Sequence, residues 1–153
     1  MYAVKEVLDV GAGRFVSPGA TRAIDPLKKY ILRSKRTHGD IVRPKSLHEY
    51  RQASAEKIPY PNNFFTKVVS RWALGFCIHR RRAYREIARV LKPGGRIEVR
   101  LLWKDRRYKK NLLLRLKEVG FDIYTEYKGV YITDHQLTEF VICGRLSKEK
   151  VIG

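Results

Sequence analysis

The sequence is short of acidic residues, has only two cysteines and contains no apolar run long enough to span a membrane. Its 15 Asp and Glu stand against 33 Lys and Arg, which gives a formal net charge of +18 and an isoelectric point near 10.2. Such a charge attracts polyanions, nucleic acid above all, although a solvated basic surface explains the same composition. Cys77 and Cys143 lack the spacing of a metal site, so we expect free thiols in a cytoplasmic protein.

Histidines are also sparse, and their scattered positions exclude a metal site built from closely spaced imidazoles: His38, His48, His79 and His135. With 153 residues and 44% hydrophobic content, the chain can form the core of one domain but not of two. We therefore expect residues 1–153 to form a single domain that holds no metal.

The most informative pattern is an apolar run, Val7–Val10, followed by two glycines. Its β-branched and apolar residues are typical of a strand that is covered on both faces. Gly11 and Gly13 permit a tight turn and let the backbone approach a ligand closely. Asp9 brings a carboxylate to the carboxyl end of this strand, which is where open α/β sheets bind their ligands.

Strands and helices alternate along the rest of the chain. We expect helices at Arg80–Leu91 and Tyr108–Val119, and strands at Glu6–Val10, Thr21–Ile24, Tyr50–Ala53, Phe65–Ser70, Arg96–Leu101, Phe121–Tyr127 and Gln136–Arg145. This alternation predicts an α/β fold with a Rossmann-like, doubly wound, mostly parallel sheet of about seven strands. The last two strands are expected to form an antiparallel pair.

Two local features predict that one face of this sheet is thinly covered. Only Arg14–Ile24 separate Gly13 from Asp25, and Ser17-Pro18-Gly19 discourages a helix there, so the helix after the first strand should be reduced. The expected strand Arg96–Leu101 alternates charged and apolar residues, which indicates one wet face. A partner is expected to cover that face, either a second copy in a homodimer or the substrate.

Two further segments extend the pattern in a fixed order. Ile58–Ser70 is a Pro/Asn loop that leads into an apolar strand, and Arg89–Gly95 ends a helix with Arg-Val-Leu-Lys-Pro-Gly-Gly. Together with Val7–Gly13 and Asp25, they resemble the class I S-adenosylmethionine-dependent methyltransferases over roughly Lys5–Arg145. The resemblance implies S-adenosylmethionine as cofactor and methyl transfer as the activity.

The resemblance also implies a cradle for the methionine end of the cofactor, formed by Asp9, Gly11, Ala12 and Gly13, and an acceptor for its ribose hydroxyls at Asp25. It further implies an adenine contact at Ser54, Ala55 and Glu56, and a pocket floor beneath the methyl group at Ser70 and Arg71. No catalytic residue is assigned, because a sulfonium donor leaves little beyond positioning and proton removal to the protein.

Several departures keep other interpretations open. Asp25-Pro26 is also a plain helix start, with the carboxylate as N-cap. Ser54 stands where the family often has Asp, and Arg14-Phe15 replaces the third glycine of its first motif. An inactive methyltransferase-like fold that binds nucleic acid or protein therefore remains an alternative. A dehydrogenase is a poorer interpretation, because Val16 stands where its third phosphate-loop glycine belongs.

The methyl acceptor is not identified by any motif. The loop of nucleic-acid amino methyltransferases, Asn/Asp-Pro-Pro-aromatic, is absent after Ser70, and Cys77 does not follow a proline. Two basic clusters, Arg80–Arg82 with Arg85 and Lys104–Lys110, follow the fourth and fifth expected strands. They predict nucleic acid or another anionic substrate as partner, although solvated helix starts explain them equally well.

Overall fold

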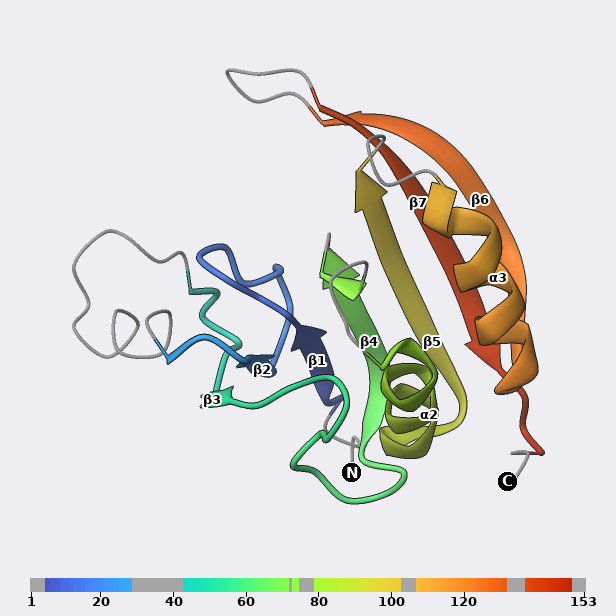
Figure 1. Cartoon of the computed structure of the whole chain (residues 1–153). Helices are drawn as coiled ribbons and strands as arrows, with labels where there is room; N and C mark the ends of the chain where they lie inside the picture. Colours follow the sequence, from blue (N-terminus) through green and yellow to red (C-terminus); the bar gives the residue numbers. More distant parts are fainter. Residues whose placement is uncertain are drawn as a thin grey trace.

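One mixed sheet of seven strands organises the chain (Figure 1). The structure is a computed structural model and describes residues 5–28, 43–71, 73–74, 79–102, 107–131 and 137–149. The strand order is β3-β2-β1-β4-β5-β7-β6, with parallel pairing from β3 to β5 and antiparallel pairing around β7. The bounds are β1 Val7–Val10, β2 Arg22–Asp25, β3 Glu49–Gln52, β4 Phe65–Arg71, β5 Leu91–Leu102, β6 Phe121–Tyr131 and β7 Leu137–Leu146. The predicted Rossmann-like sheet and its antiparallel C-terminal pair are confirmed.

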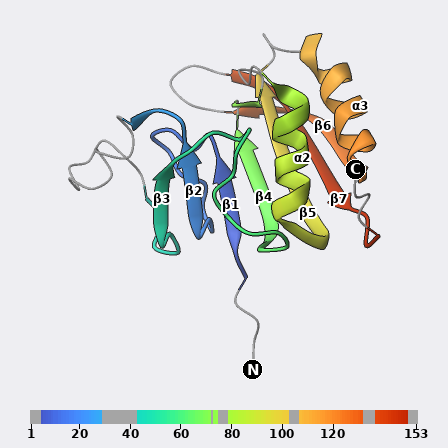
Figure 2. The same cartoon turned by 60° about the horizontal axis from the view of Figure 1, so that its bottom comes forward.

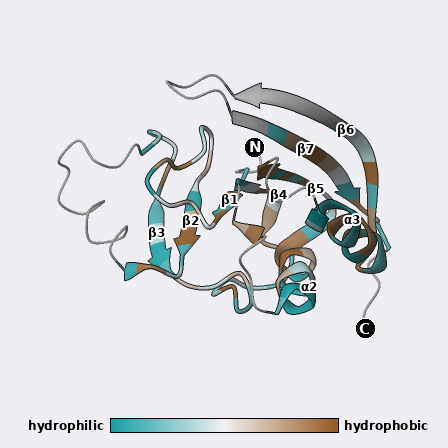
Figure 3. Ribbon diagram, turned by 45° about the horizontal axis from the view of Figure 1, so that its top comes forward, coloured by the Kyte–Doolittle hydropathy of each residue, from teal (hydrophilic) through white to brown (hydrophobic). Residues whose placement is uncertain are grey.

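Two helices, α2 (Arg80–Val90) and α3 (Lys109–Glu118), lie on the same face of the sheet (Figure 2). Both were expected from periodicity, and each end agrees within one residue. Helix α2 buries Ala83, Ile87 and Val90, which recur along one side of a helix, and Figure 3 shows its apolar side toward the sheet. These side chains form the main core with residues of the strands beneath them, among them Leu8, Ile24, Phe65, Val68, Ile97, Val99 and Ile142.

The opposite side of the sheet, here called the helix-free face, carries no helix within the described ranges (Figures 2 and 3). On β5, Ile97 and Val99 are buried in the core, whereas the alternate residues Glu98 and Arg100 are only partly buried. Arg100 Nη1 lies 2.6 Å from Glu139 Oε1 and its Nε lies 3.3 Å from Glu98 Oε2. The predicted wet face is therefore confirmed, and it carries charged side chains.

Residues 11–21 stand in place of a crossover helix, which confirms that the helix after β1 is reduced. The amide of Ala20 donates to the Ser17 carbonyl at 3.1 Å, with Pro18 and Gly19 between them. Gly19 has φ +81°, so the segment matches a type II turn with Pro and Gly in their preferred positions. The segment covers the β1–β3 end of the sheet through a second, small apolar cluster: Val16, Ala20, Ala23 and Tyr50.

Arg89 explains why the Pro/Asn loop and the end of α2 belong together. Its guanidinium donates to the carbonyls of Ile58 and Tyr60, each at 2.8 Å, and its Nε lies 2.7 Å from Glu86 Oε1. The other oxygen of Glu86 accepts the Ile58 amide at 2.8 Å. Burial alone would raise the pKa of Glu86, but these hydrogen bonds and the charge of Arg89 outweigh it and hold the pKa below its ordinary value.

We expect Arg89→Lys to lower the free energy of unfolding by about 2 kcal/mol, because an ammonium cannot reproduce the planar fork that reaches both carbonyls. Urea unfolding measures the loss. Arg85→Lys is the matched control, since Arg85 is exposed on the same helix; its effect should stay within about 0.5 kcal/mol. Equal stability of the two variants would contradict the role of Arg89.

Candidate cofactor site

The carboxyl ends of β1, β2 and β4 meet at one edge of the sheet, because these strands run parallel. Three buried polar side chains lie there: Asp9 is 1% exposed, Asp25 6% and Ser70 0%. The Ser70 hydroxyl donates to the Val10 carbonyl at 3.1 Å and so joins the end of β4 to the end of β1. The structure thus gathers residues that lie far apart in the sequence at the edge where α/β sheets bind ligands.

The glycine turn after β1 is fastened to the end of β2. The amides of Gly11 and Ala12 both donate to the Ile24 carbonyl, at 2.9 and 3.1 Å, and the Gly13 amide donates to Asp25 Oδ2 at 3.1 Å. Gly11 and Gly13 have φ of +69° and +58°, a region that favours glycine. These three amides already donate to protein acceptors, so they are not available to donate to a ligand.

Asp9 is the most unusual group at this edge. Its Oδ2 accepts the Ser17 amide at 2.7 Å, whereas its Oδ1 is buried and, among the described residues, has no hydrogen-bond partner. Burial raises the pKa of Asp9 to about 6, although the amide and the side chain of Ser17 and the charge of Arg71 act in the opposite direction. A buried carboxylate oxygen without a partner is costly unless a ligand satisfies it.

Asp25 combines the two roles that its sequence position allows. Its Oδ1 accepts the Leu27 amide at 2.9 Å, the local bond of an N-cap or Asx turn, while Oδ2 holds the Gly13 amide. A carboxylate has about four lone-pair sites, so both oxygens can still accept from a hydroxyl.

The other predicted site residues have protein contacts of their own. Ser54 Oγ accepts the Glu56 amide at 3.1 Å, Ala55 is buried in the core, and Glu56 Oε1 accepts the His79 amide at 2.7 Å just before α2. The Arg71 guanidinium donates to the Phe15 carbonyl and so ties the end of β4 to the turn after Gly13. These residues lie near the strand ends, and their roles toward a ligand stay predictions.

Sequence reasoning missed two residues that shape the site. Ser17 supplies the amide that holds Asp9, and Tyr50 on β3 donates from its hydroxyl to the Gly13 carbonyl at 2.8 Å. The Ser-Pro-Gly signal for a turn was visible, but its closeness to Asp9 depends on the path of the chain in space. Nothing in the local sequence around Tyr50 indicates its partner.

The structure brings the two predicted basic clusters together on the helix side of the sheet. The Arg80 guanidinium lies over the Tyr108 ring at 4.3 Å, and that of Arg107 lies 5.3 Å from the same ring. Arg80 begins α2 and Tyr108 is the N-cap of α3, and neither helix has an acidic residue in its first turn. The part of the second cluster at 104–106 lies outside the described residues.

Within the described ranges, no helix is long and apolar enough to cross a membrane. No group of three His, Cys, Asp or Glu in that part of the chain is arranged to hold a metal ion.

Comparisons with known proteins agree with this geometry. The chain spans the fold of a SAM-dependent methyltransferase from Methanosarcina mazei with a TM-score of 0.71 and 17% identity, covering 97% of this chain and 95% of that one. A SAM-dependent methyltransferase from Thermotoga maritima gives 0.67 and 15%, with 96% and 84% covered. The [4+2]-cyclase SpnF also gives 0.67, at 19% identity over 94% of this chain and 75% of its own. These likenesses define the class I SAM-dependent methyltransferase fold.

The methyltransferase domain family matches residues 8–99, more than half of the chain. The chain belongs to this family, whose cofactor is S-adenosylmethionine. Among curated relatives, the ubiquinone/menaquinone biosynthesis C-methyltransferase UbiE of Pseudomonas fluorescens is 47% identical over 51 residues, 33% of this chain and 20% of that protein. The match thus spans about a fifth of the length of this relative.

The residues at the carboxyl edge fit the chemical groups of this cofactor. The unpartnered Oδ1 of Asp9 is an acceptor suited to an ammonium group. The remaining lone pairs of Asp25 suit a pair of hydroxyls. Apart from its chain neighbours, no described residue has an atom within 4 Å of the point where a Cβ on Gly13 would lie, which leaves this side of the turn open to a ligand.

Proposed function

We propose that the chain transfers a methyl group from S-adenosylmethionine to an anionic acceptor. The observation that carries this proposal is Asp9, a carboxylate that is 1% exposed, precedes the glycine turn and has one oxygen without a hydrogen-bond partner among the described residues. When bound, the cofactor supplies an electrophilic methyl group on a sulfonium centre. Asp9 would hold the ammonium group and Asp25 the ribose hydroxyls, while the Ser70–Val10 contact keeps the strand ends in register.

An anionic acceptor is supported by the charges that surround the starts of α2 and α3. Arg80, Arg81 and Arg82 occupy the first turn of α2, where the helix dipole already repels cations. Such an arrangement is unfavourable alone and becomes favourable when an anion lies between the two helix starts. Nucleic acid is the acceptor class that we favour, because a net charge of +18 suits a polyanion better than a single small anion.

We expect Asp25→Ala to weaken S-adenosylmethionine binding by more than about 100-fold, because two hydrogen bonds to a charged carboxylate are lost. Calorimetric titration of the cofactor into the purified chain measures the loss. Asp122→Ala is the matched control, since Asp122 is exposed on β6, and its affinity should equal that of the wild type.

The same titration separates the two roles of Asp25. If the carboxylate only holds the Gly13 and Leu27 amides, Asp25→Ala lowers the melting temperature but leaves the affinity of the folded protein unchanged. A wild-type chain that binds no cofactor would overturn the proposal and favour a methyltransferase-like fold that acts as a binding module.

A further inference from the structure

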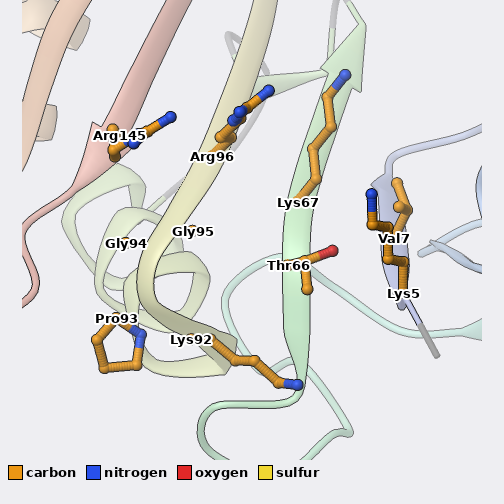
Figure 4. Close-up of a pocket in the computed structure, with 10 residues that line it drawn as sticks. All are labelled: Lys5, Val7, Thr66, Lys67, Lys92, Pro93, Gly94, Gly95, Arg96 and Arg145. Carbon is orange, nitrogen blue, oxygen red and sulfur yellow. The ribbon is translucent and has the colours of Figure 1, made fainter. Parts of the chain in front are cut away.

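The helix-free face contains a hollow of about 480 Å³ whose charged side chains are all cationic (Figure 4). It lies at the amino ends of β1, β4 and β5, the edge opposite the candidate cofactor site. Its floor includes the Pro93–Gly95 segment, which bulges out of β5 as the pairing passes from Phe65–Leu91 to Lys67–Arg96. Its described lining residues are Lys5, Val7, Thr66, Lys67, Lys92, Pro93, Gly94, Gly95, Arg96 and Arg145.

Three of these cations form a row across neighbouring strands, here called the cationic row: Lys67 on β4, Arg96 on β5 and Arg145 on β7. The register pairs Lys67 directly with Arg96, and Arg96 directly with Arg145. Figure 4 shows the three side chains extending from the same side of the sheet. Like charges directly opposite each other in a sheet are destabilising, so the row is unfavourable without an anion.

Two acidic residues flank the row, Glu98 on β5 and Asp122 on β6, which the register pairs directly with Arg145. They are fewer than the five cations that line the hollow, so its charge stays positive. Lys67 Nζ lies 3.9 Å from Glu98 Oε1, but Glu98 also pairs with Arg100 at 3.3 Å. Within the described part of the chain, Arg96 and Arg145 make no ion pair, and both side chains are exposed. A further cation lies close by, since the Lys148 side chain comes within 3.9 Å of the point where a Cβ on Gly94 would lie.

The size and lining of the hollow narrow the ligand chemistry. A volume of about 480 Å³ is more than a single phosphate needs. Neighbouring strands lie about 4.8 Å apart, so the cationic row spans roughly 10 Å. That length suits more than one phosphate along a nucleic-acid strand, whose charges follow one another at short intervals. No aromatic side chain is among the described lining residues, so stacking on bases is not offered.

We propose that this hollow is a docking site for the phosphate backbone of a nucleic acid, bound without sequence preference by the cationic row. A second copy of this chain fits the hollow poorly, because it would bring the same excess of positive charge against it. The inference does not rest on methyl transfer, since the hollow lies at the other edge of the sheet and the test below contains no cofactor.

The test is a fluorescence-anisotropy titration of a labelled DNA duplex of about 20 base pairs at several salt concentrations. Arg96→Gln/Arg145→Gln removes two cations of the row. The matched control, Lys45→Gln/Lys117→Gln, removes two exposed charges away from the hollow. We expect the row variant to bind about tenfold more weakly or worse, with a salt slope shallower by about 2, since each lost phosphate contact contributes about 0.9. The control should stay within about twofold of the wild type.

Melting temperature and sedimentation complete the test. The row variant should melt at or above the wild-type temperature, because it loses like-charge repulsion, so weaker binding cannot be ascribed to unfolding. Equal binding by the row variant and the control would overturn the proposal, as would a wild-type chain that does not bind the duplex. A wild-type dimer that becomes a monomer in the row variant would assign the hollow to a second copy and would overturn it too.

Discussion

Asp9→Asn is expected to abolish S-adenosylmethionine binding and, at neutral pH, to make the folded chain more stable. The wild-type carboxylate is buried, and only one of its oxygens has a partner among the described residues. The isosteric amide can still accept the Ser17 amide, but it carries no charge that needs solvation. It also offers no negative charge to an ammonium group, so the change that stabilises the fold removes the proposed ligand contact.

The pH dependence of this gain has a definite sign. The pKa of Asp9 is about 6 in the folded chain and 3.8 in an unperturbed carboxyl, so the folded state binds the proton more tightly. Between these values the folded state holds more protons than the unfolded state, and the free energy of unfolding falls as pH rises, by roughly 3 kcal/mol in total. The stability advantage of Asp9→Asn should therefore grow from near zero around pH 4 to roughly 3 kcal/mol above pH 6.

Urea unfolding of the wild type and of Asp9→Asn across this pH range measures the difference in their free energies of unfolding. The contributions of the other titratable groups cancel in this difference, because both proteins contain them. The wild-type affinity for the cofactor should rise with pH through about 6, as the attracting carboxylate forms. Asp122→Asn is the control, because this exposed acid should change neither stability nor affinity. An Asp9→Asn variant that binds like the wild type would refute the role of Asp9.

Most of the fold could be predicted, because the signals are local. Buried positions of α2 recur at helical spacing, and β5 alternates between core residues such as Ile97 and charged residues such as Glu98. The order of the motifs along the chain then favoured one topology, that of the class I methyltransferases. Arg89 shows how two of those motifs are joined in this chain: its guanidinium fastens the Pro/Asn loop to α2.

The candidate site was predicted less completely, because its contacts join distant segments. The glycine turn was expected to offer backbone amides, yet the amides of Gly11 and Ala12 are used by the Ile24 carbonyl. The sequence allowed two roles for Asp25, a helix N-cap or an acceptor for ligand hydroxyls. In the structure its carboxylate accepts the Leu27 amide and keeps lone pairs that could still accept from a ligand. The cationic row could not be seen in sequence, because its members become neighbours only through strand register.

Gly11→Ala is expected to lower the free energy of unfolding by about 3–5 kcal/mol. The residue has φ +69°, where a side chain is strained. A Cβ built there would lie 2.2 Å from the Cβ of Ala73, so the chain that leaves β4 would have to move. Because that segment follows Ser70 and Arg71, the same shift should weaken cofactor binding in whatever fraction remains folded.

The variant Gly13→Ala separates the cost of backbone strain at positive φ from the cost of a steric clash. Gly13 has a similar φ, +58°, but no described residue beyond its chain neighbours comes within 4 Å of the point where a Cβ would lie, so this variant should lose only about 1–2 kcal/mol. The difference between the two variants is the cost of the contact with Ala73, and Ala73→Gly should recover much of it in the double variant. Equal losses at the two glycines, or no recovery, would show that the end of β4 does not pack against the turn.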